Sequence, residues 1–234
     1  MSAYPSVKTV EEFRQQPQDY QTAVRKIVRS HALNELYGAQ VFDEPAIRLA
    51  PTPYAKWLTC RVAMEEYHHH VRFKELADQI GVRADEMDAR HKRPLNIFEV
   101  PLESWEQFCV IKMLGDLAEI LQVEDLLHCS FHPLRNLARQ TMPEERFHAQ
   151  FGEDFSAELV KTPEGKARLQ AAVNEYWPYL PKFFGGSKSK NNEIFRKWKI
   201  KQRTNDEMRE DFVKRATEVA AKYGLTLPEV RLAA

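Results

Sequence analysis

Apolar residues recur at helical spacing along most of this chain and rarely alternate as they would in a β-strand. A first helix is predicted over residues 20–42 and a second from Pro53 to about residue 80, with the turn-forming sequence DEPAIRLAPTP between them. Thr52 followed by Pro53 is typical of a helix start. The first third of the chain is therefore predicted to form two long helices.

The rest of the chain continues this pattern after a long connection at residues 81–103. Capping boxes, in which a Ser or Thr is followed three residues later by Glu or Gln, and Thr-Pro or Pro starts mark the later helices. These predicted starts are Ser104–Gln107, Pro133, Thr162–Pro163 and Thr204–Glu207. Pro143 falls inside the fourth helix, where a kink is expected. Gly224 is expected to end the last helix.

Composition supports a helical protein with one core. The chain has 234 residues, of which 43% are hydrophobic and 29% charged, so it can bury one substantial core, and we expect a single domain over residues 1–234. It has only eight glycines and few runs rich in Val, Ile and Thr, which argues against an extensive sheet. The expected fold class is all-α.

Charge and targeting signals narrow the possible partners and location. The formal net charge is zero, which gives no general case for binding nucleic acid. The start, MSAYPSVKTVEEF, lacks an apolar signal core, and no stretch of about 18 apolar residues occurs, so we expect a cytoplasmic protein without a membrane span. Cys60, Cys109 and Cys129 lack metal-ligand or redox spacing and are expected to be buried, reduced thiols.

Two Glu-x-x-His steps stand on the second and fourth predicted helices, and another carboxylate lies about 30 residues before each step, on the first and third helices. Residues three apart share one face of a helix, so each Glu and His can bind one ion together. Four carboxylates and two neutral imidazoles balance two divalent cations, as in the two-metal sites of four-helix bundles. The predicted ligands are Glu35, Glu65, His68, Asp116, Glu145 and His148.

The second helix offers two overlapping steps, Glu65 with His68 and Glu66 with His69. Winding the helix at about 100° per residue places several apolar residues within roughly 20° of Glu65 and displaces Glu66 by about 100°. Those apolar residues are Tyr54, Leu58 and Leu76. The winding therefore favours Glu65 and His68 as the pair that faces the core.

Two alternatives bear on this ligand set. Each carboxylate taken alone is more typical of a solvated helix face, but four carboxylates that converge in a bundle without cations would repel one another strongly. On the third helix, Glu119 lies one turn beyond Asp116 and competes with it as a ligand. Asp116 reproduces the spacing of the first half better, which leaves Glu119 as a supporting residue.

A basic cluster near the C-terminus has Phe195 and Trp198 interleaved with lysines and arginines. Lys199, Lys201 and Arg203 in this cluster are candidate ligands for the phosphates of coenzyme A. A solvated helix face and the binding of an acidic partner are the alternatives, since local charge density alone does not separate them.

Three stretches carry a resemblance to a known family. These are SerTrp at 104–105, GluGluArgPheHis at 144–148 and the segment from TrpLysIleLys to ThrAsnAspGluMetArg at 198–209. Together with the ligand residues, they resemble the catalytic subunits of phenylacetyl-coenzyme A epoxidases, in the phenylacetic acid catabolic family. The resemblance implies a ferritin-like four-helix bundle with additional C-terminal helices and two irons. It also implies an oligomeric assembly, a flavin and iron–sulfur reductase and a structural sister subunit.

The resulting hypothesis is a di-iron monooxygenase that inserts one oxygen atom of O2 into an aromatic acyl-CoA and gives a ring epoxide. Glu65 and Glu145 are expected to bridge the ions, and Arg61 stands where the family carries an interior lysine. Manganese is possible in place of iron, because carboxylate and imidazole ligands suit both metals. The alternative functions are a ferritin-like iron or manganese oxidase and a non-catalytic scaffold subunit.

Overall fold

The computed structural model describes residues 6–88, 90 and 95–230, and within these residues it is all-α, as predicted. The one extended contact in the described chain is an isolated parallel bridge between Val7 and Phe131. Part of the predicted connection at 81–103, namely residues 89 and 91–94, lies outside the described residues.

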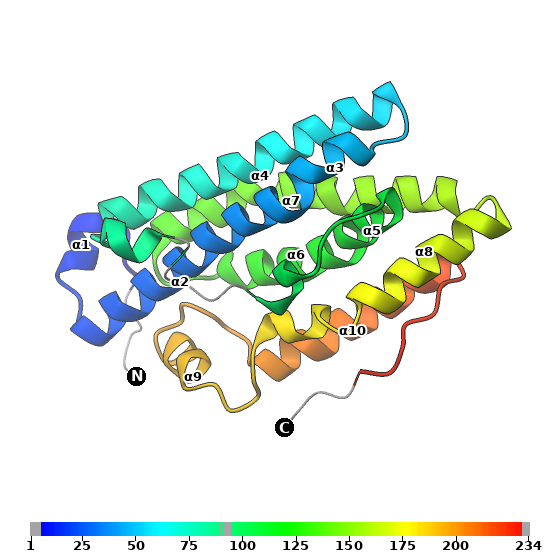
Figure 1. Ribbon diagram of the computed structural model, residues 1–234. Coiled ribbons are helices and arrows are strands. Elements are labelled where there is room, and N and C mark those ends of the chain that lie inside the picture. Colours follow the sequence, from blue (N-terminus) through cyan, green and yellow to red (C-terminus); the bar gives the residue numbers. More distant parts are fainter. Residues whose placement is uncertain (1–5, 89, 91–94, 231–234) are drawn as a thin grey trace.

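Four long helical stretches form the centre of the molecule (Figure 1). The first comprises α2 (Gln18–Gly38), the π-helical segment η1 (Ala39–Asp43) and α3 (Glu44–Leu49), and the second is α4 (Pro53–Gln79). The third comprises α5 (Trp105–Val110), the π-helical segment η5 (Ile111–Gly115) and α6 (Asp116–Leu126), and the fourth is α7 (His132–Leu159).

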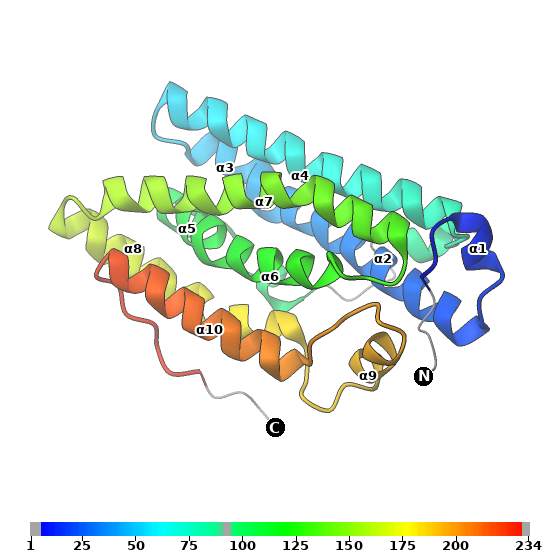
Figure 2. The same ribbon diagram turned by 180° about the vertical axis from the view of Figure 1, so that it is seen from behind.

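Shorter helices surround this bundle. Figures 1 and 2 show α8 and α10 side by side against α5 and α6, on the side of the bundle away from α4. The additional C-terminal helices therefore add a second layer to the bundle. These surrounding elements are α1 (Val10–Arg14), η2 (Ala84–Met87), η4 (Asn96–Glu99), α8 (Pro163–Tyr176), η6 (Leu180–Phe184), α9 (Lys190–Lys197) and α10 (Asn205–Lys222).

The predicted helix starts are confirmed by their capping bonds. The side chains of Thr52, Ser104, Thr162 and Thr204 each accept a hydrogen bond from the backbone amide three residues later. Each bond satisfies one amide that has no partner inside the helix. The last helix ends as predicted, at Gly224, whose φ of 61° suits a residue without a Cβ.

The first helix does not break where it was expected to. Instead of ending near residue 42, it continues through η1 and past Pro45 to Leu49, and the turn is confined to residues 50–52. Pro45 is tolerated because it stands in the first turn of α3. A π-helical segment fits one extra residue into a helix and is frequent at functional sites.

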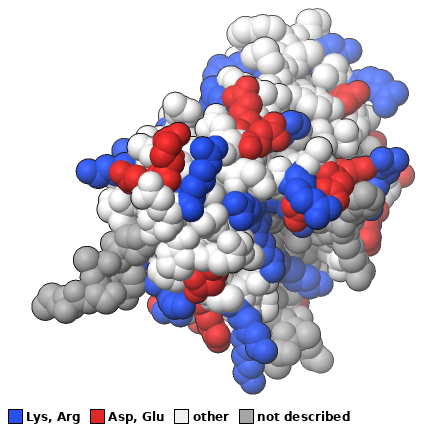
Figure 3. Space-filling view, turned by 90° about the vertical axis from the view of Figure 1, so that its left-hand side faces the viewer, with Lys and Arg blue, Asp and Glu red and all other residues white. Residues whose placement is uncertain are grey.

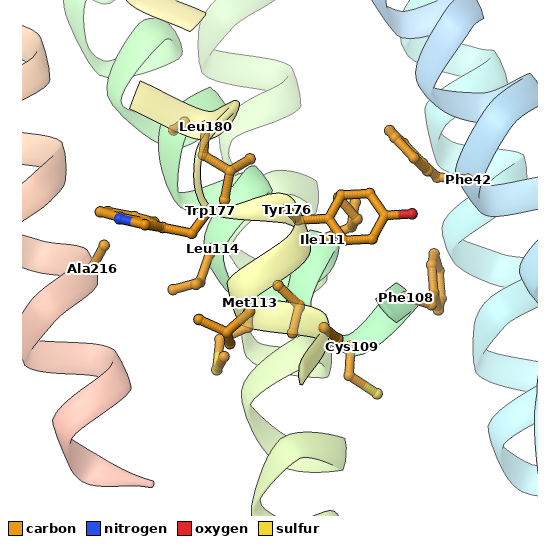
Figure 4. Packing of buried hydrophobic residues seen from close by; sticks show 14 of the residues in the cluster. Phe42, Phe108, Cys109, Ile111, Met113, Leu114, Tyr176, Trp177, Leu180 and Ala216 are labelled. Atoms are coloured by element: carbon orange, nitrogen blue, oxygen red, sulfur yellow. The ribbon is translucent and has the colours of Figure 1, made fainter. Parts of the chain in front are cut away.

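Aromatic side chains join the bundle to the outer layer. Phe108, Cys109 and Leu114, from α5 and η5, pack with Tyr176 and Trp177 at the end of α8 (Figure 4). Cys109 and Cys129 are buried free thiols, as expected, whereas Cys60 is exposed, contrary to expectation. Among the described helices, none is long and apolar enough to cross a lipid bilayer.

Gly152 sets how closely α7 approaches η5. A Cβ on Gly152 would collide with the backbone of Lys112 and Met113. We therefore expect Gly152→Ala to reduce the free energy of unfolding by about 1–3 kcal/mol, because the two backbones must separate. Guanidinium denaturation measures the change. Gly38→Ala is the control, since its Cβ meets nothing within 4 Å. Equal stability of the two variants would contradict this account of the packing.

Candidate metal centre

Buried carboxylates and imidazoles from all four long stretches converge in the middle of the bundle. One group comprises Glu35, Glu66, His69 and Glu145, and a second comprises Glu66, Asp116, Glu145 and His148. Within each group the possible ligand atoms lie within 4.8 Å of one another. Because Glu66 and Glu145 belong to both groups, the arrangement suits two neighbouring cations that share two carboxylates.

The predicted choice of step on α4 is wrong. His69 is fully buried in the cluster, whereas the side chain of His68 is exposed at the surface. The winding argument failed because it treated Tyr54 as a core residue, and Tyr54 is 63% exposed. Glu66 and His69 therefore take the places that were predicted for Glu65 and His68. The structure brings the other four predicted ligands together.

Several polar atoms of the cluster lack hydrogen-bond partners. The Nδ1 atoms of His69 and His148 and one carboxylate oxygen of Asp116 are buried without one. Unpaired buried polar atoms are costly, so a group of them facing one another needs a compensating ligand. A pair of cations bound by these nitrogens and oxygens supplies that compensation. The residues present therefore fit a two-metal centre.

Each imidazole is held by a carboxylate from the opposite helix. The Nε2 atom of His148 lies 2.9 Å from Glu65, and the Nε2 atom of His69 lies 2.8 Å from Glu144. This leaves the Nδ1 atom of each ring directed at the cluster, and a carboxylate behind a ligand histidine fixes its ring orientation. Glu65 is thus a positioning residue for His148. The sequence signal for this cross-bracing is the repeated pattern Glu-Glu-x-x-His at 65–69 and 144–148.

Arginines complete both braces. The Nε atom of Arg61 donates to Glu65 at 2.8 Å, and Arg72 donates to Glu144 at 3.2 Å. The Arg61 side chain is 45% exposed, and its guanidinium lies 3.9 Å from the ring centre of Phe147. Arg61 therefore does not occupy the interior of the cluster, where it was predicted to act.

The interior cation is Lys112, which the sequence analysis missed. Its ammonium group is fully buried and lies 2.9 Å from Asp43, 2.8 Å from Glu66 and 3.2 Å from Asp116. Asp43 belongs to η1 and Lys112 to η5, so the two π-helical segments face each other here. The sequence did contain a signal, because Lys112 is a lone lysine in an apolar run one turn before Asp116.

Burial shifts the titration of the cluster. It raises the pKa values of Glu35 and Asp116, and it raises that of Asp43 to about 6. Burial alone would lower the pKa of Lys112, but the carboxylates around it raise that pKa further. For His148, burial acts downward and is outweighed by Glu66 and Glu65, which raise the pKa to about 10. Without metal, this imidazole therefore holds a proton.

A pocket opens beside the centre. Glu35, Glu66, Asp116 and Glu145 line its polar side. Its apolar side is formed by Phe42, Leu95, Ile97, Phe98, Ile111 and Phe183. A small molecule in this pocket therefore contacts both the carboxylate cluster and an apolar wall.

The basic cluster near the C-terminus makes internal contacts. Lys201 donates to Gln122 at 2.5 Å, and Arg203 pairs with Asp125 and Asp211 at 3.3 and 3.1 Å. Lys201 and Arg203 therefore hold the segment before α10 against its neighbours, and they are not arranged as the predicted phosphate site. On the end of the molecule seen in Figure 3, basic and acidic side chains are interspersed.

Comparison with known proteins identifies relatives. The family model described as phenylacetic acid catabolic protein matches residues 1–233. One relative is a 1,2-phenylacetyl-CoA epoxidase subunit from Escherichia coli (strain K12). It is 29% identical over 221 residues, which cover 91% of this chain and 71% of the relative.

The cross-bracing predicts a measurable loss of metal affinity. We expect Glu65→Gln and Glu144→Gln each to weaken Mn²⁺ binding by about 10- to 100-fold, the usual effect of losing a carboxylate behind a ligand histidine. Isothermal titration measures the affinity, and circular dichroism checks the fold. Glu75→Gln, at an exposed position on the same helix as Glu65, is the control. Unchanged affinity in both variants would refute the bracing role.

Metal binding should also release protons. The pKa of His148 in the metal-free fold, about 10, exceeds its ordinary value of 6.5. The stabilisation from its protonated form is complete below about pH 6.5 and is lost as the pH rises through about 10. A cation must displace this proton, so the affinity for Mn²⁺ should increase between about pH 6 and pH 8. An indicator dye measures proton release, and binding without it would contradict this interpretation.

Proposed function

Because the chain belongs to the phenylacetic acid catabolic protein family, we propose that it is the oxygenase component of a multicomponent system. In this proposal it inserts one oxygen atom of O2 into an aromatic, phenylacetyl-type acyl-CoA and forms a ring epoxide. The observation that carries the proposal is the pair of buried ligand groups that share Glu66 and Glu145. The relative named as an epoxidase subunit supports the choice of reaction.

The proposed cofactor is a pair of iron ions, with manganese as the alternative metal. Glu35 and His69 would hold one ion, Asp116 and His148 the other, and the two shared glutamates would contact both. The bound irons supply the redox chemistry that activates O2. Donor atoms of this type suit either metal, so supply and geometry select between them.

The surrounding residues would keep this chemistry in a fixed geometry. Glu65 and Glu144 hold the two imidazole rings from behind, which keeps each Nδ1 atom directed inward. Lys112 pairs with Asp43, and this pair adds no net charge to the centre. The four ligand carboxylates are then left to balance two divalent cations.

The pocket supports an aromatic substrate. Phe42, Ile97 and Phe98 offer apolar and aromatic surface opposite the carboxylates, which suits a phenyl ring and leaves little room for water between the ring and the centre. The coenzyme A portion would extend outward from the pocket. Its phosphate ligands remain unassigned, because Lys201 and Arg203 make internal contacts.

The proposed partners follow from the chemistry. Insertion of one oxygen atom from O2 consumes two further electrons, and we propose a flavin and iron–sulfur reductase as their source. The relative is named as one of several components of its enzyme, which supports assembly with further chains, including a structural sister subunit.

Glu145→Ala should abolish oxygen insertion while the protein stays helical, because one of the two shared carboxylates is lost. The assay combines the protein, its partner subunits, a reductase, phenylacetyl-CoA and ¹⁸O2, and mass spectrometry measures label in the product. Glu158→Ala, at an exposed position on the same helix, is the control. Activity in the Glu145 variant would refute the site. Oxygen uptake that needs neither acyl-CoA nor reductase would instead favour an iron or manganese oxidase.

A further inference from the structure

A third group of possible metal ligands lies beside the two-metal centre. His31, Glu35 and Glu119 offer ligand atoms within 4.8 Å of one another. The Nδ1 atom of His31 lies 3.3 Å from the Oε1 atom of Glu119. Glu35 also belongs to the first central group, so the third group and the centre share a carboxylate.

The third group is held in place by its surroundings. The His31 side chain is buried and stacks on Phe73, with ring centres 5.1 Å apart and planes at 14°. His31 and Glu35 lie four residues apart on α2 and therefore on one face of that helix. A rigid imidazole beside two carboxylates is a donor set that divalent transition metals bind.

Glu119 has an oxygen that internal contacts do not satisfy. Its Oε1 atom is buried without a hydrogen-bond partner, since the approach of His31 lacks hydrogen-bond geometry. Lys201 carries the nearby positive charge, but its ammonium group donates to Gln122 at 2.5 Å. A cation between His31, Glu35 and Glu119 would satisfy the Oε1 atom directly.

The pocket links this third group to the exterior. Glu35 and Glu119 both line the pocket, and the Glu119 side chain remains 24% exposed. Glu35 lies deeper, with its carboxylate 3.8 Å from the Nδ1 atom of His69. A cation that enters through the pocket thus meets Glu119 before it reaches the central ligands.

We propose that His31, Glu35 and Glu119 form a third divalent-cation site, which captures ions from the pocket and passes them to the centre through Glu35. The inference rests on the proposed two-metal function, since the third site delivers ions to that centre. It differs from the predicted role of Glu119 as a supporting residue, because Glu119 here binds a cation itself.

The first test locates the ions. Crystals of the full chain grown with Mn²⁺ should show three anomalous peaks, one of them between His31, Glu35 and Glu119. Glu119→Gln should remove this peak and leave the two central peaks. Glu124→Gln, on the same helix and paired with Arg215 at the surface, is the control and should keep all three. The absence of a third peak in the wild type overturns the proposal.

The second test measures transfer. Stopped-flow mixing of metal-free protein with Fe²⁺ under anaerobic conditions should show central loading at least about tenfold slower in Glu119→Gln, a loss within the range for residues that support a metal site. The final iron content should match the wild type. An unchanged rate overturns the proposal. Altered affinity of the central ions with no third peak overturns it too, because Glu119 would then act only by positioning.

The two proposals fail in distinguishable ways. If the central pair fails to load in the wild type and in the Glu124→Gln control, the two-metal function is wrong and the third site loses its role. If the central pair loads normally and the third peak is absent, only the third site is wrong.

Discussion

The rest of the structure depends on the balance of charge at the centre of the bundle. Five buried carboxylates meet there, from Glu35, Asp43, Glu66, Asp116 and Glu145, and the interior supplies one ammonium group and two imidazoles against them. In a low-dielectric interior, uncompensated charge of one sign destabilises the fold strongly. Protons meet part of this need without metal, as the raised pKa of His148 indicates. Two divalent cations meet it fully, so metal binding and stability are coupled at this site.

The two π-helical segments and one glycine provide the geometry for this balance. The segment η1 positions Asp43 and the segment η5 positions Lys112, and their side chains meet 2.9 Å apart. Gly152 lets α7 approach η5 so closely that a Cβ would collide with the backbone. Irregular helix geometry is therefore concentrated where the buried charges must be brought within bonding distance.

The centre has approximate twofold character that its surroundings break. The two Glu-Glu-x-x-His segments brace each other, since the first glutamate of each holds the histidine of the other. On the Asp116 side, Lys112 and Asp43 close the centre with an internal ion pair. On the Glu35 side, His31 and Glu119 leave a carboxylate oxygen unsatisfied next to the pocket. The two halves of the centre thus differ in charge and in access to the exterior.

The sequence alone determined the all-α class, the helix starts at Thr52, Ser104 and Thr204, and four of the six central ligands, because capping and the spacing of carboxylates are local properties. Only the tertiary structure decided between Glu65 and Glu66, since both are buried and an exposed Tyr54 misled the helical winding. It also revealed Lys112 and the grouping of His31 with Glu119. These contacts join residues from different helices, and helical periodicity does not encode which neighbouring faces meet.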